Sequence, residues 1–371
     1  MKVLLVGNYA PDRQISMDLF PRMLGQALES RGIETLTIKP RVRIGRRTGA
    51  SRGCGKWLGY VDKLVLFPAD LRALAGDFDL VHVCDHSNSP YTRVLQGIPH
   101  VVTCHDVLAI CSARGEIPQN PTRWSGRQLQ RLIARGLERA RHVVCVSEAT
   151  RTRLLRVTGR DPAHTSVVPS ATNHPYRPLD TAEARTRLGE LLPLKAPYIL
   201  HVGADAWYKN RTGAVRIFAA LVQKPGFEQL RLVMASPAPN PAIAQQACAL
   251  GVSERVHEIS GASAEQLEGL YSGAEALLFP SLAEGFGWPV LEAMACGCPV
   301  VTSNRPPMTE VAGDAAIYID PEQPESAAQL IATAWDERPR LRRRGLERAA
   351  AFSTESMAAG YESVYERVVA A

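Results

Sequence analysis

Residues 284–292 of the chain read Glu284-Gly-Phe-Gly-Trp-Pro-Val-Leu-Glu292, and they follow a short apolar run, Ala276-Leu-Leu-Phe-Pro280. A short apolar run of this kind is typical of a buried strand. Pro289 suits the first position of a helix, because proline lacks the N–H group that would be unpaired there anyway. Gly297 stands where that helix is expected to end. The segment therefore predicts a strand, a glycine-rich turn and a helix.

Such a turn is suited to binding an anion. The first N–H groups of a helix have no partner within the helix, and they often bind phosphate. Glu284 and Glu292 add two carboxylates, which accept hydrogen bonds from sugar hydroxyls. An isolated glutamate usually lies on the surface, but the apolar neighbours of Glu292 predict a buried helix, where a carboxylate without a partner is costly. N–H donors for phosphate and carboxylates for hydroxyls together suit a nucleotide sugar.

The stretch from Pro280 to Val301 follows the pattern Glu-Gly-Phe-Gly-x-Pro-x-x-Glu-Ala-x-Ala-x-Gly-x-Pro-Val. It closely resembles the signature of the retaining family-4 glycosyltransferases, and a weaker resemblance covers nearly the whole chain. The resemblance implies an α/β protein of the GT-B fold. In that fold two Rossmann-like, doubly wound domains face each other across a cleft, and a C-terminal helix crosses back to the first domain.

The same resemblance implies a function. It is the transfer of a hexosyl unit from a UDP- or GDP-linked sugar to an acceptor hydroxyl, with retention of configuration and without a metal or a cofactor. The acceptor would be a sugar, a lipid-linked molecule or another small molecule. The expected context is the biosynthesis of glycans, polysaccharides or glycolipids.

Length and composition agree with a two-domain globular enzyme. The chain has 371 residues, of which 46% are hydrophobic and 22% charged, which are ordinary values for a soluble protein longer than one domain. No apolar run reaches the length of a membrane span, and residues 1–7 enter a strand without the features of a signal peptide. We therefore expect a cytoplasmic protein. The eight cysteines include no Cys-x-x-Cys pair, so a zinc site is not expected.

The charge is unevenly distributed. Residues 1–177 hold 26 Lys and Arg against 14 Asp and Glu, whereas the remainder holds 17 against 23. The densest basic stretch, residues 39–67, ends in a run that predicts an amphipathic helix. One hypothesis is peripheral contact with the inner membrane surface or with a phosphorylated lipid acceptor. The alternative, which we favour, is a solvated loop before a helix that packs on a sheet. Nucleic acid is not an expected partner, because no nucleic-acid-binding motif accompanies the charge.

Strand and helix patterns alternate throughout, which predicts parallel sheets covered by helices on both faces. Helices are expected at residues 17–31, 128–139 and 352–371. A proline-rich stretch places a boundary near residue 177. The predicted domains are 1–177 for the acceptor, 178–352 for the nucleotide sugar, and a terminal helix, 353–371, on the first domain. The expected strands are residues 3–6, 34–38, 80–84, 101–104, 142–146, 166–168, 198–202, 230–235, 255–259, 275–279, 299–302 and 316–319.

The loop after residues 198–202 carries Gly203, Lys209 and Asn210. A lysine here can meet the diphosphate and neutralise the charge that develops on the departing nucleotide. The alternative is a solvated loop lysine, the commoner fate of a lysine. Relatives in the family it resembles carry a further basic residue before this lysine. Tyr208 or the Ala204-Asp205 pair stands there instead, and Arg211 and Arg305 are candidates to replace that contact.

Residues 103–106, Thr-Cys-His-Asp, end a strand of the first half. The resemblance implies that His105 lies beside the transferred sugar and stabilises the positive charge at its anomeric carbon. Without the resemblance, a structural histidine is an equally good interpretation. In the N-terminal loop, Arg13 and Gln14 are candidate acceptor contacts, and Ser16 is expected to cap the following helix.

Taken together, the predicted catalytic residues are His105, Lys209 and Glu284, and no metal ligands are predicted. By the resemblance Glu284 holds the transferred hexose and Glu292 the ribose. The residues predicted to bind the donor are Gly203, Lys209, Asn210, Gly285, Phe286, Gly287, Trp288, Pro289, Val290, Leu291 and Glu292.

Four other functions remain in view. A nucleotide-sugar epimerase or a sugar phosphorylase would use the same fold, and an epimerase would convert the donor without an acceptor. A nicotinamide-dependent oxidoreductase needs Gly-x-Gly-x-x-Gly after a first strand, and neither Gly7 nor Gly203 opens such a run. A periplasmic-type binding protein would need an export signal.

Overall fold

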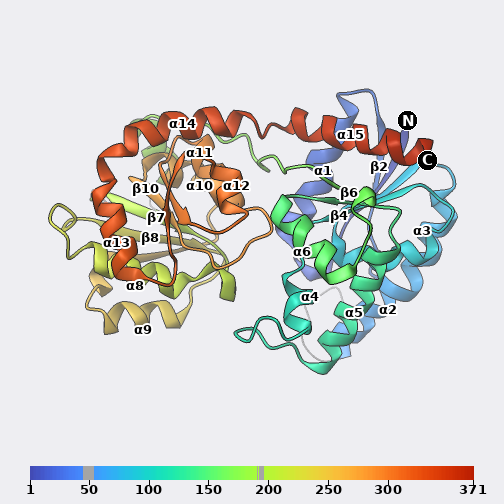
Figure 1. Ribbon diagram of the computed structural model, residues 1–371, viewed down its shortest axis with the longest axis horizontal. Helices are drawn as coiled ribbons and strands as arrows, with labels where there is room; N and C mark the ends of the chain where they lie inside the picture. The colour runs from blue at the N-terminus through green and yellow to red at the C-terminus, as the bar shows by residue number, and fades with distance from the viewer. Residues whose placement is uncertain (45–53, 190, 192–195) are drawn as a thin grey trace. The chain divides into compact units, whose positions relative to one another are not determined.

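The computed structural model (Figure 1) describes residues 1–44, 54–189, 191 and 196–371. The chain divides into two compact units. The first unit combines Met1–Asn173 with Ser353–Ala371, and the second comprises His174–Phe352. The predicted boundary near residue 177 falls a few residues after Asn173.

The first unit is built on a six-stranded parallel sheet with the strand order β2-β1-β3-β4-β5-β6. Its strands are β1 (Lys2–Val6), β2 (Glu34–Ile38), β3 (Leu80–Val83), β4 (His100–Cys104), β5 (His142–Cys145) and β6 (Thr165–Val167). Its helices are η1 (Ala10–Asp12), α1 (Ile15–Glu29), α2 (Cys54–Val61), η2 (Asp62–Leu66), α3 (Phe67–Ala75), η3 (His86–Val94), α4 (Leu108–Ala113), α5 (Trp124–Arg139), α6 (Glu148–Thr158), η4 (Pro162–His164) and α15 (Thr354–Ala370).

Helices cover both faces of this sheet, because its strands are apolar on both sides. Along β1 the side chains of Val3 and Leu5 join one core, which also contains residues of α1 and α15. Leu4 and Val6 point to the opposite face and join the core beneath α3 and α5. Side chains alternate across a strand, so a continuous run of apolar residues fills both cores at once.

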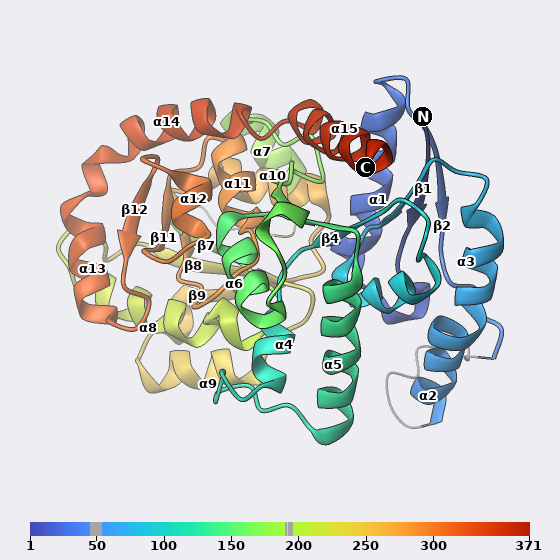
Figure 2. The same cartoon turned by 45° about the vertical axis from the view of Figure 1, so that its right-hand side comes forward.

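The C-terminal helix α15 belongs to the first unit and packs beside α1 (Figure 2). Two of its tyrosines enter a buried hydrogen-bond network. The hydroxyl of Tyr365 lies 2.7 Å from His82 Nδ1, and His82 Nε2 lies 2.7 Å from the Thr103 hydroxyl. Thr103 also bonds to Tyr361 at 2.9 Å. Burial lowers the pKa of His82 to about 3, so its ring is neutral in the folded protein.

The second unit has its own six-stranded parallel sheet, with the order β12-β11-β10-β7-β8-β9. Its strands are β7 (Tyr198–Val202), β8 (Arg231–Ser236), β9 (Val256–Ser260), β10 (Ala276–Phe279), β11 (Val300–Ser303) and β12 (Ala316–Ile319). Its helices are α7 (Thr181–Leu188), η5 (Trp207–Lys209), α8 (Arg211–Leu221), α9 (Pro241–Ala249), η6 (Ser253–Arg255), α10 (Ala264–Gly273), α11 (Trp288–Ala295), α12 (Met308–Ala312), α13 (Pro324–Thr333), η7 (Trp335–Glu337) and α14 (Arg338–Ala350).

The predicted architecture is confirmed. Each expected strand is present within one residue of its predicted bounds, and both sheets are parallel. Helix ends were less accurate. The helix expected at residues 17–31 begins at Ile15, and Gln14 occupies its N-cap position. The prediction that Ser16 caps this helix is therefore wrong, because Ser16 lies within the first turn.

Candidate functional site

The second sheet has a topological switch point between β7 and β10. From β7 the chain continues outward to β8 and β9, and it then returns to β10 on the other side of β7. In such sheets, ligands bind at the carboxyl ends of the two strands that flank this point. The loop after β7 carries residues 203–210, and the loop after β10 carries residues 280–287. Both predicted donor-binding segments therefore meet at one place.

Lys209 and Glu284 form a buried ion pair at this point. Lys209 Nζ lies 2.8 Å from Glu284 Oε1, and their side chains are only 13% and 9% exposed. Ser281 donates a hydrogen bond of 2.9 Å to the same carboxylate oxygen. The ammonium group also lies 4.8 Å from the centre of the Phe279 ring. The structure thus brings together two residues that the sequence predicted separately.

The side chain of Lys209 passes close to the backbone of Gly203. A Cβ atom at position 203 would lie 3.2 Å from Lys209 Cδ and 3.3 Å from its Cγ. Any larger residue would push the lysine stem away from the loop. Asn210 supports the same loop by donating to the carbonyls of Pro280 and Pro321 at 3.0 and 3.2 Å. Its amide hydrogens tie the loop after β7 to the loop after β10, which makes Asn210 a positioning residue.

Glu292 lies one turn into α11 and is buried, with 7% of its surface exposed. Tyr271 donates a hydrogen bond of 2.7 Å to Glu292 Oε2. Burial raises the pKa of Glu292, and the hydrogen bond from Tyr271 and the charge of Lys209 only partly oppose this rise. The carboxylate thus has one protein partner, Tyr271, that the sequence reasoning missed. Tyr271 lies on a different helix, α10, so spacing along the chain gave no signal for it.

The turn before α11 has the conformation that its glycines predict. Gly287 adopts φ of 100°, which glycine tolerates far better than other residues, and it occupies the N-cap position. The side chains of Phe286, Pro289, Val290 and Leu291 are buried in the unit, and Trp288 is half-buried. The N–H groups of Val290 and Leu291 already bind the carbonyl of Gly287. These side chains pack inside the unit, and Gly285 and Phe286 belong to the turn before α11.

Arg211 and Arg305 were the candidates to replace the missing basic residue. Among the described contacts, both pair with other carboxylates and not with Glu284. Arg211 is buried and pairs with Glu258. Arg305 pairs with Glu322 at 2.5 Å and with Asp320 at 3.5 Å.

His105 lies in the first unit, directly after β4, and is buried. Its Nε2 atom lies 2.9 Å from the Cys84 carbonyl, and its ring packs edge-on against Phe20 with centroids 4.8 Å apart. Burial lowers the pKa of His105, although the nearby charge of Asp85 acts in the opposite direction. Asp106 accepts a hydrogen bond of 2.8 Å from the Leu108 N–H, so it orders the start of α4.

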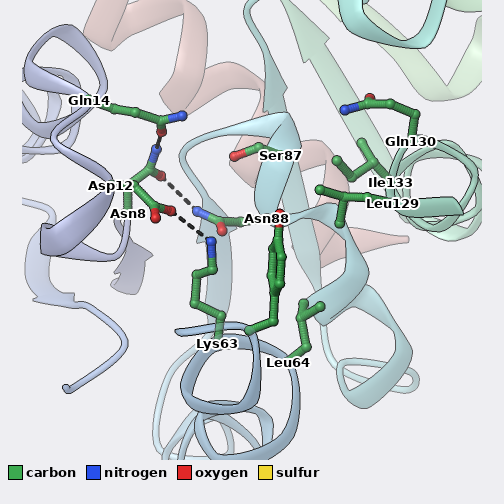
Figure 3. Close-up of a pocket in the computed structure, with 11 residues that line it drawn as sticks. Asn8, Asp12, Gln14, Lys63, Leu64, Ser87, Asn88, Leu129, Gln130 and Ile133 are labelled. Atoms are coloured by element: carbon green, nitrogen blue, oxygen red, sulfur yellow. Dashed lines mark hydrogen bonds and ion pairs between the residues drawn. The ribbon is translucent and has the colours of Figure 1, made fainter. Parts of the chain in front are cut away.

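The first sheet has its switch point between β1 and β3, and a pocket of about 340 Å³ lies there (Figure 3). Gln14, a predicted acceptor contact, is in its wall, whereas Arg13 is not among the lining residues. The pocket is lined by Asn8, Asp12, Gln14, Tyr60, Lys63, Leu64, Ser87, Asn88, Leu129, Gln130 and Ile133.

The buried carboxylate of Asp85 binds two side chains that line this pocket, Asn8 and Ser87. Asp85 accepts a hydrogen bond of 2.6 Å from Asn8 Nδ2, and it also accepts from the N–H and hydroxyl of Ser87. Asn8 binds Gln14 as well, and its carbonyl accepts from Asn88 at 2.7 Å. Burial alone would raise the pKa of Asp85, but His86, His105 and these hydrogen bonds outweigh burial and lower it. Asn8 and Asp85 both follow strands, which was the available sequence signal for them.

The basic stretch at residues 39–67 is only partly described, because residues 45–53 lie outside the described residues. The expected helix at its end is divided among α2, η2 and α3, and Phe67 and Leu71 of α3 enter the core of the first unit.

Within the described residues, every helix is too short or too polar to span a lipid bilayer. Among the same described residues, no group of three or more His, Cys, Asp or Glu side chains is arranged to hold a metal ion.

Two family models match this chain, one in each half of the sequence. Residues 184–351 match the family described as glycosyl transferases group 1, and residues 21–174 match glycosyltransferase family 4. The MMP α-(1→4)-mannosyltransferase of Mycolicibacterium hassiacum is 30% identical over 80% of this chain and 72% of its own length. The D-inositol 3-phosphate glycosyltransferase of Nocardia farcinica is 30% identical over 80% of this chain and 68% of its own. The O-antigen chain mannosyltransferase B of Escherichia coli is 26% identical over 70% and 69%.

Solved structures share the fold over the whole chain. Sucrose-phosphate synthase from Thermosynechococcus elongatus superposes with a TM-score of 0.77 at 20% identity, covering 100% of this chain and 99% of that one. Anabaena HepE in complex with UDP and glucose gives a TM-score of 0.74 at 17% identity, covering 99% and 100%. The three curated relatives named above are glycosyltransferases, and none of them supports the oxidoreductase or binding-protein alternative. This chain belongs to the family-4 glycosyltransferases and has the GT-B fold.

Proposed function

We propose that the protein transfers a hexosyl unit from a UDP- or GDP-linked sugar to an acceptor hydroxyl, with retention of configuration. The observation that carries the proposal is the buried Lys209–Glu284 pair at the switch point of the second sheet, with Glu292 on the adjoining helix. A related fold has been solved with UDP and glucose bound, which supports a nucleotide-sugar donor.

In this proposal Lys209 contacts the diphosphate. Its ammonium group neutralises the negative charge that grows on the leaving nucleotide, and its burial strengthens that interaction. Glu284 binds hydroxyls of the transferred hexose, and Glu292 accepts from the ribose hydroxyls. Glu284 accepts from Lys209 and Ser281, and Glu292 accepts from Tyr271; a carboxylate has about four acceptor positions, so a ligand can share them.

The proposed reaction is a same-face displacement. The bond between the anomeric carbon and the diphosphate oxygen breaks while the acceptor oxygen attacks from that same face. The acceptor proton passes to the departing phosphate oxygen. The neutral ring or the backbone carbonyl of His105 stabilises the positive charge at the anomeric carbon. Isolation of a covalent hexosyl ester on Glu284 would contradict this mechanism.

We also propose that the reaction needs no metal ion or cofactor. Transfer should then survive exhaustive treatment with EDTA, followed by assay in metal-free buffer. Loss of activity that Mg²⁺ or Mn²⁺ restores would refute this part. The names of the relatives, which include an O-antigen chain mannosyltransferase, support a role in glycan, polysaccharide or glycolipid biosynthesis.

A thermal-shift panel with UDP, GDP, ADP and their sugars tests the donor directly. A ligand that binds the folded state raises the melting temperature in proportion to its affinity and concentration. We expect one nucleotide to stabilise the protein, and NMR of the product should give the anomeric configuration of the donor. Conversion of the donor without any acceptor would favour an epimerase instead. A panel in which no nucleotide stabilises the protein would refute the donor assignment.

Peripheral contact with an anionic membrane surface is a further part of this proposal, and helix α5 supports it. Five exposed arginines recur at every fourth position, and Trp124 on the same face is 74% exposed. Among the described residues, Arg127 and Arg131 bond to neutral groups, whereas Arg43 and Arg156 elsewhere in the unit pair with carboxylates. The five arginines are Arg123, Arg127, Arg131, Arg135 and Arg139.

Exposed arginines attract anionic lipid headgroups, and an exposed tryptophan can enter the membrane interface. The wild type should co-sediment with vesicles that contain phosphatidylglycerol, and the double variant Arg127→Glu, Arg131→Glu should not. Equal binding of both proteins would refute the contact.

A further inference from the structure

The turn that follows strand β3 contacts two different parts of the first unit. The carbonyl of Cys84 lies 2.9 Å from His105 Nε2. The next residue, Asp85, is the N-cap of η3 and accepts from the N–H and the hydroxyl of Ser87 at 2.9 and 2.8 Å. Its carboxylate also accepts from Asn8 Nδ2 at 2.6 Å, in the loop after β1. The same short turn therefore adjoins His105 and two of the side chains that line the pocket in Figure 3.

The hydrogen bond to Cys84 decides which nitrogen of His105 carries the proton. A carbonyl oxygen can only accept, so Nε2 is the donor. Burial lowers the pKa of His105, which favours the neutral ring. In a neutral ring with its proton on Nε2, the lone pair is on Nδ1. Nδ1 is therefore the ring atom that can stabilise a positive charge.

Aromatic packing holds the ring of His105 but does not select between its nitrogens. Phe20 of α1 packs edge-on against this ring, with centroids 4.8 Å apart. Phe20 in turn contacts Tyr361 of α15, with centroids 6.1 Å apart. Apolar burial is non-directional, so it restricts movement of the ring without fixing a proton on one atom. The choice of nitrogen depends on the Cys84 carbonyl.

The position of that carbonyl depends on its two neighbours in the chain. On the strand side, the N–H of Cys84 binds the carbonyl of Val6 at 3.0 Å. On the other side, the anchor is the carboxylate of Asp85. Burial alone would raise the pKa of Asp85, but His86, His105 and its hydrogen bonds outweigh burial and lower it. The group is therefore ionised at neutral pH, and hydrogen bonds to an ionised group are stronger than those between neutral groups.

Capping alone does not explain why Asp85 is buried. The same unit has a second aspartate that caps a 3-10 helix: Asp161 begins η4 and accepts from the N–H of Ala163 at 2.8 Å. Asp161 is exposed, whereas Asp85 is only 3% exposed. Burying a charge is costly unless it is well bound. The buried position of Asp85 thus indicates a role beyond ending a turn.

We propose that Asp85 is a positioning residue of the transfer reaction. It holds the turn after β3 so that the Cys84 carbonyl keeps the proton of His105 on Nε2. Nδ1 is then the ring atom that stabilises the positive charge at the anomeric carbon. The inference rests on the proposed function, because that function gives His105 its part in the reaction.

Hydrogen exchange of histidine ring N–H groups, followed by NMR, tests the positioning without turnover. Asp85→Asn keeps the side-chain shape but removes the charge that strengthens its hydrogen bonds, so the Nε2–H of His105 should exchange about tenfold faster. His100 is the reference within the same unit. Its Nδ1 donates to the carbonyl of Ile98 at 2.8 Å, and its Nε2 accepts from the N–H of Arg141 at 3.0 Å. Exchange at His100 should stay the same.

Kinetics show whether the fixed ring serves the reaction. Asp85→Asn should lower kcat by about tenfold, as expected for one weakened hydrogen bond to a charged group, and should keep the nucleotide-induced thermal shift. Asp161→Asn is the matched control, because it changes the same kind of cap, and both kcat and the exchange at His105 should stay unchanged. Ser87→Ala removes only the hydroxyl donor to Asp85. It should speed exchange at His105 by a smaller factor, and it replaces Asp85→Asn if that variant does not fold.

The inference is overturned if neither Asp85→Asn nor Ser87→Ala changes the exchange at His105. It is also overturned if exchange at His100 rises by the same factor, because the whole unit would then be loosened. A third contradiction would be a wild-type kcat in Asp85→Asn while His105→Ala lowers kcat. If no transfer and no nucleotide binding is detected, the proposed function fails, whereas the exchange rates still decide whether Asp85 fixes the ring of His105.

Discussion

The two units use one architecture, and each places its candidate site at the switch point of its own sheet. In the second unit the site follows β7 and β10, and in the first it follows β1 and β3. Each also has a glycine after the first strand with a lysine stem against it. A Cβ at Gly7 would lie 3.1 Å from Lys39 Cε, as one at Gly203 would lie 3.2 Å from Lys209 Cδ.

The chemistry at the two switch points differs. The second unit places a largely buried lysine and two buried carboxylates there, whereas the first unit presents amide groups, the buried Asp85 and an ion pair between Asp12 and Lys63. Buried charge is costly unless it serves a charged ligand or a partner. This difference supports the proposal that the nucleotide sugar binds at the second unit.

Replacement of Lys209 by alanine should give the largest effect. We expect kcat/KM for the donor to fall by about 10²- to 10³-fold, because a preorganised cation at the leaving group is lost, and the nucleotide-induced thermal shift should disappear. The matched lysine of the first unit provides the control: Lys39→Ala should keep the nucleotide shift. If both variants lose the shift, or neither does, the assignment of the donor to the second unit fails.

His105→Ala tests the first unit's contribution to chemistry. We expect kcat to fall by about 100-fold, the lower end of the range for one lost transition-state contact. The nucleotide shift should stay, because the donor assignment concerns the other unit. Loss of packing against Phe20 will lower the melting temperature. Rates are therefore compared at a temperature below the melting temperatures of both the wild type and the variant. An unchanged kcat would make His105 structural.

Glu292→Gln separates binding from stability. Because the pKa of Glu292 is raised in the folded state, ionisation of this group disfavours folding above its unfolded pKa of about 4.3. Glutamine removes that cost and can still accept from Tyr271. We expect donor kcat/KM to fall by roughly tenfold, with a melting temperature at pH 7 equal to or above that of the wild type. A large destabilisation would show that the carboxylate is structural.

The smallest effect concerns pH. Burial lowers the pKa of His82 to about 3 and that of His142 and His201 to about 4. Each binds a proton more readily in the unfolded chain, whose histidine pKa is about 6.5. Stability is therefore full above that value and falls as the pH drops through it toward 4. Glu292 acts in the opposite direction above its unfolded pKa.

Urea unfolding at pH 7, 6 and 5 measures this dependence. His142→Gln should reduce the slope, because one of the histidines with a lowered pKa no longer takes up a proton on unfolding. A free energy of unfolding that does not change between pH 7 and pH 5 would contradict it.

The sequence by itself determined the fold and the two loops that form the candidate site of the second unit. Strands of a parallel sheet are buried on both faces, so they appear as continuous apolar runs, and each expected strand was found within one residue. The Gly-rich turn at residues 284–287 and the glycine and lysine of the loop after β7 were likewise readable, because a turn or a close approach restricts which residue can occupy a position.

Only the tertiary structure decided which side chains meet. The Lys209–Glu284 pair, the Tyr271–Glu292 bond and the Asp12–Lys63 pair each join residues from separate elements. The pocket gathers residues from 8 to 133, and the α15 tyrosines bond to residues of β3 and β4. Such contacts leave no periodicity in the chain, since they depend on where strands lie in a sheet and not on their spacing along the sequence.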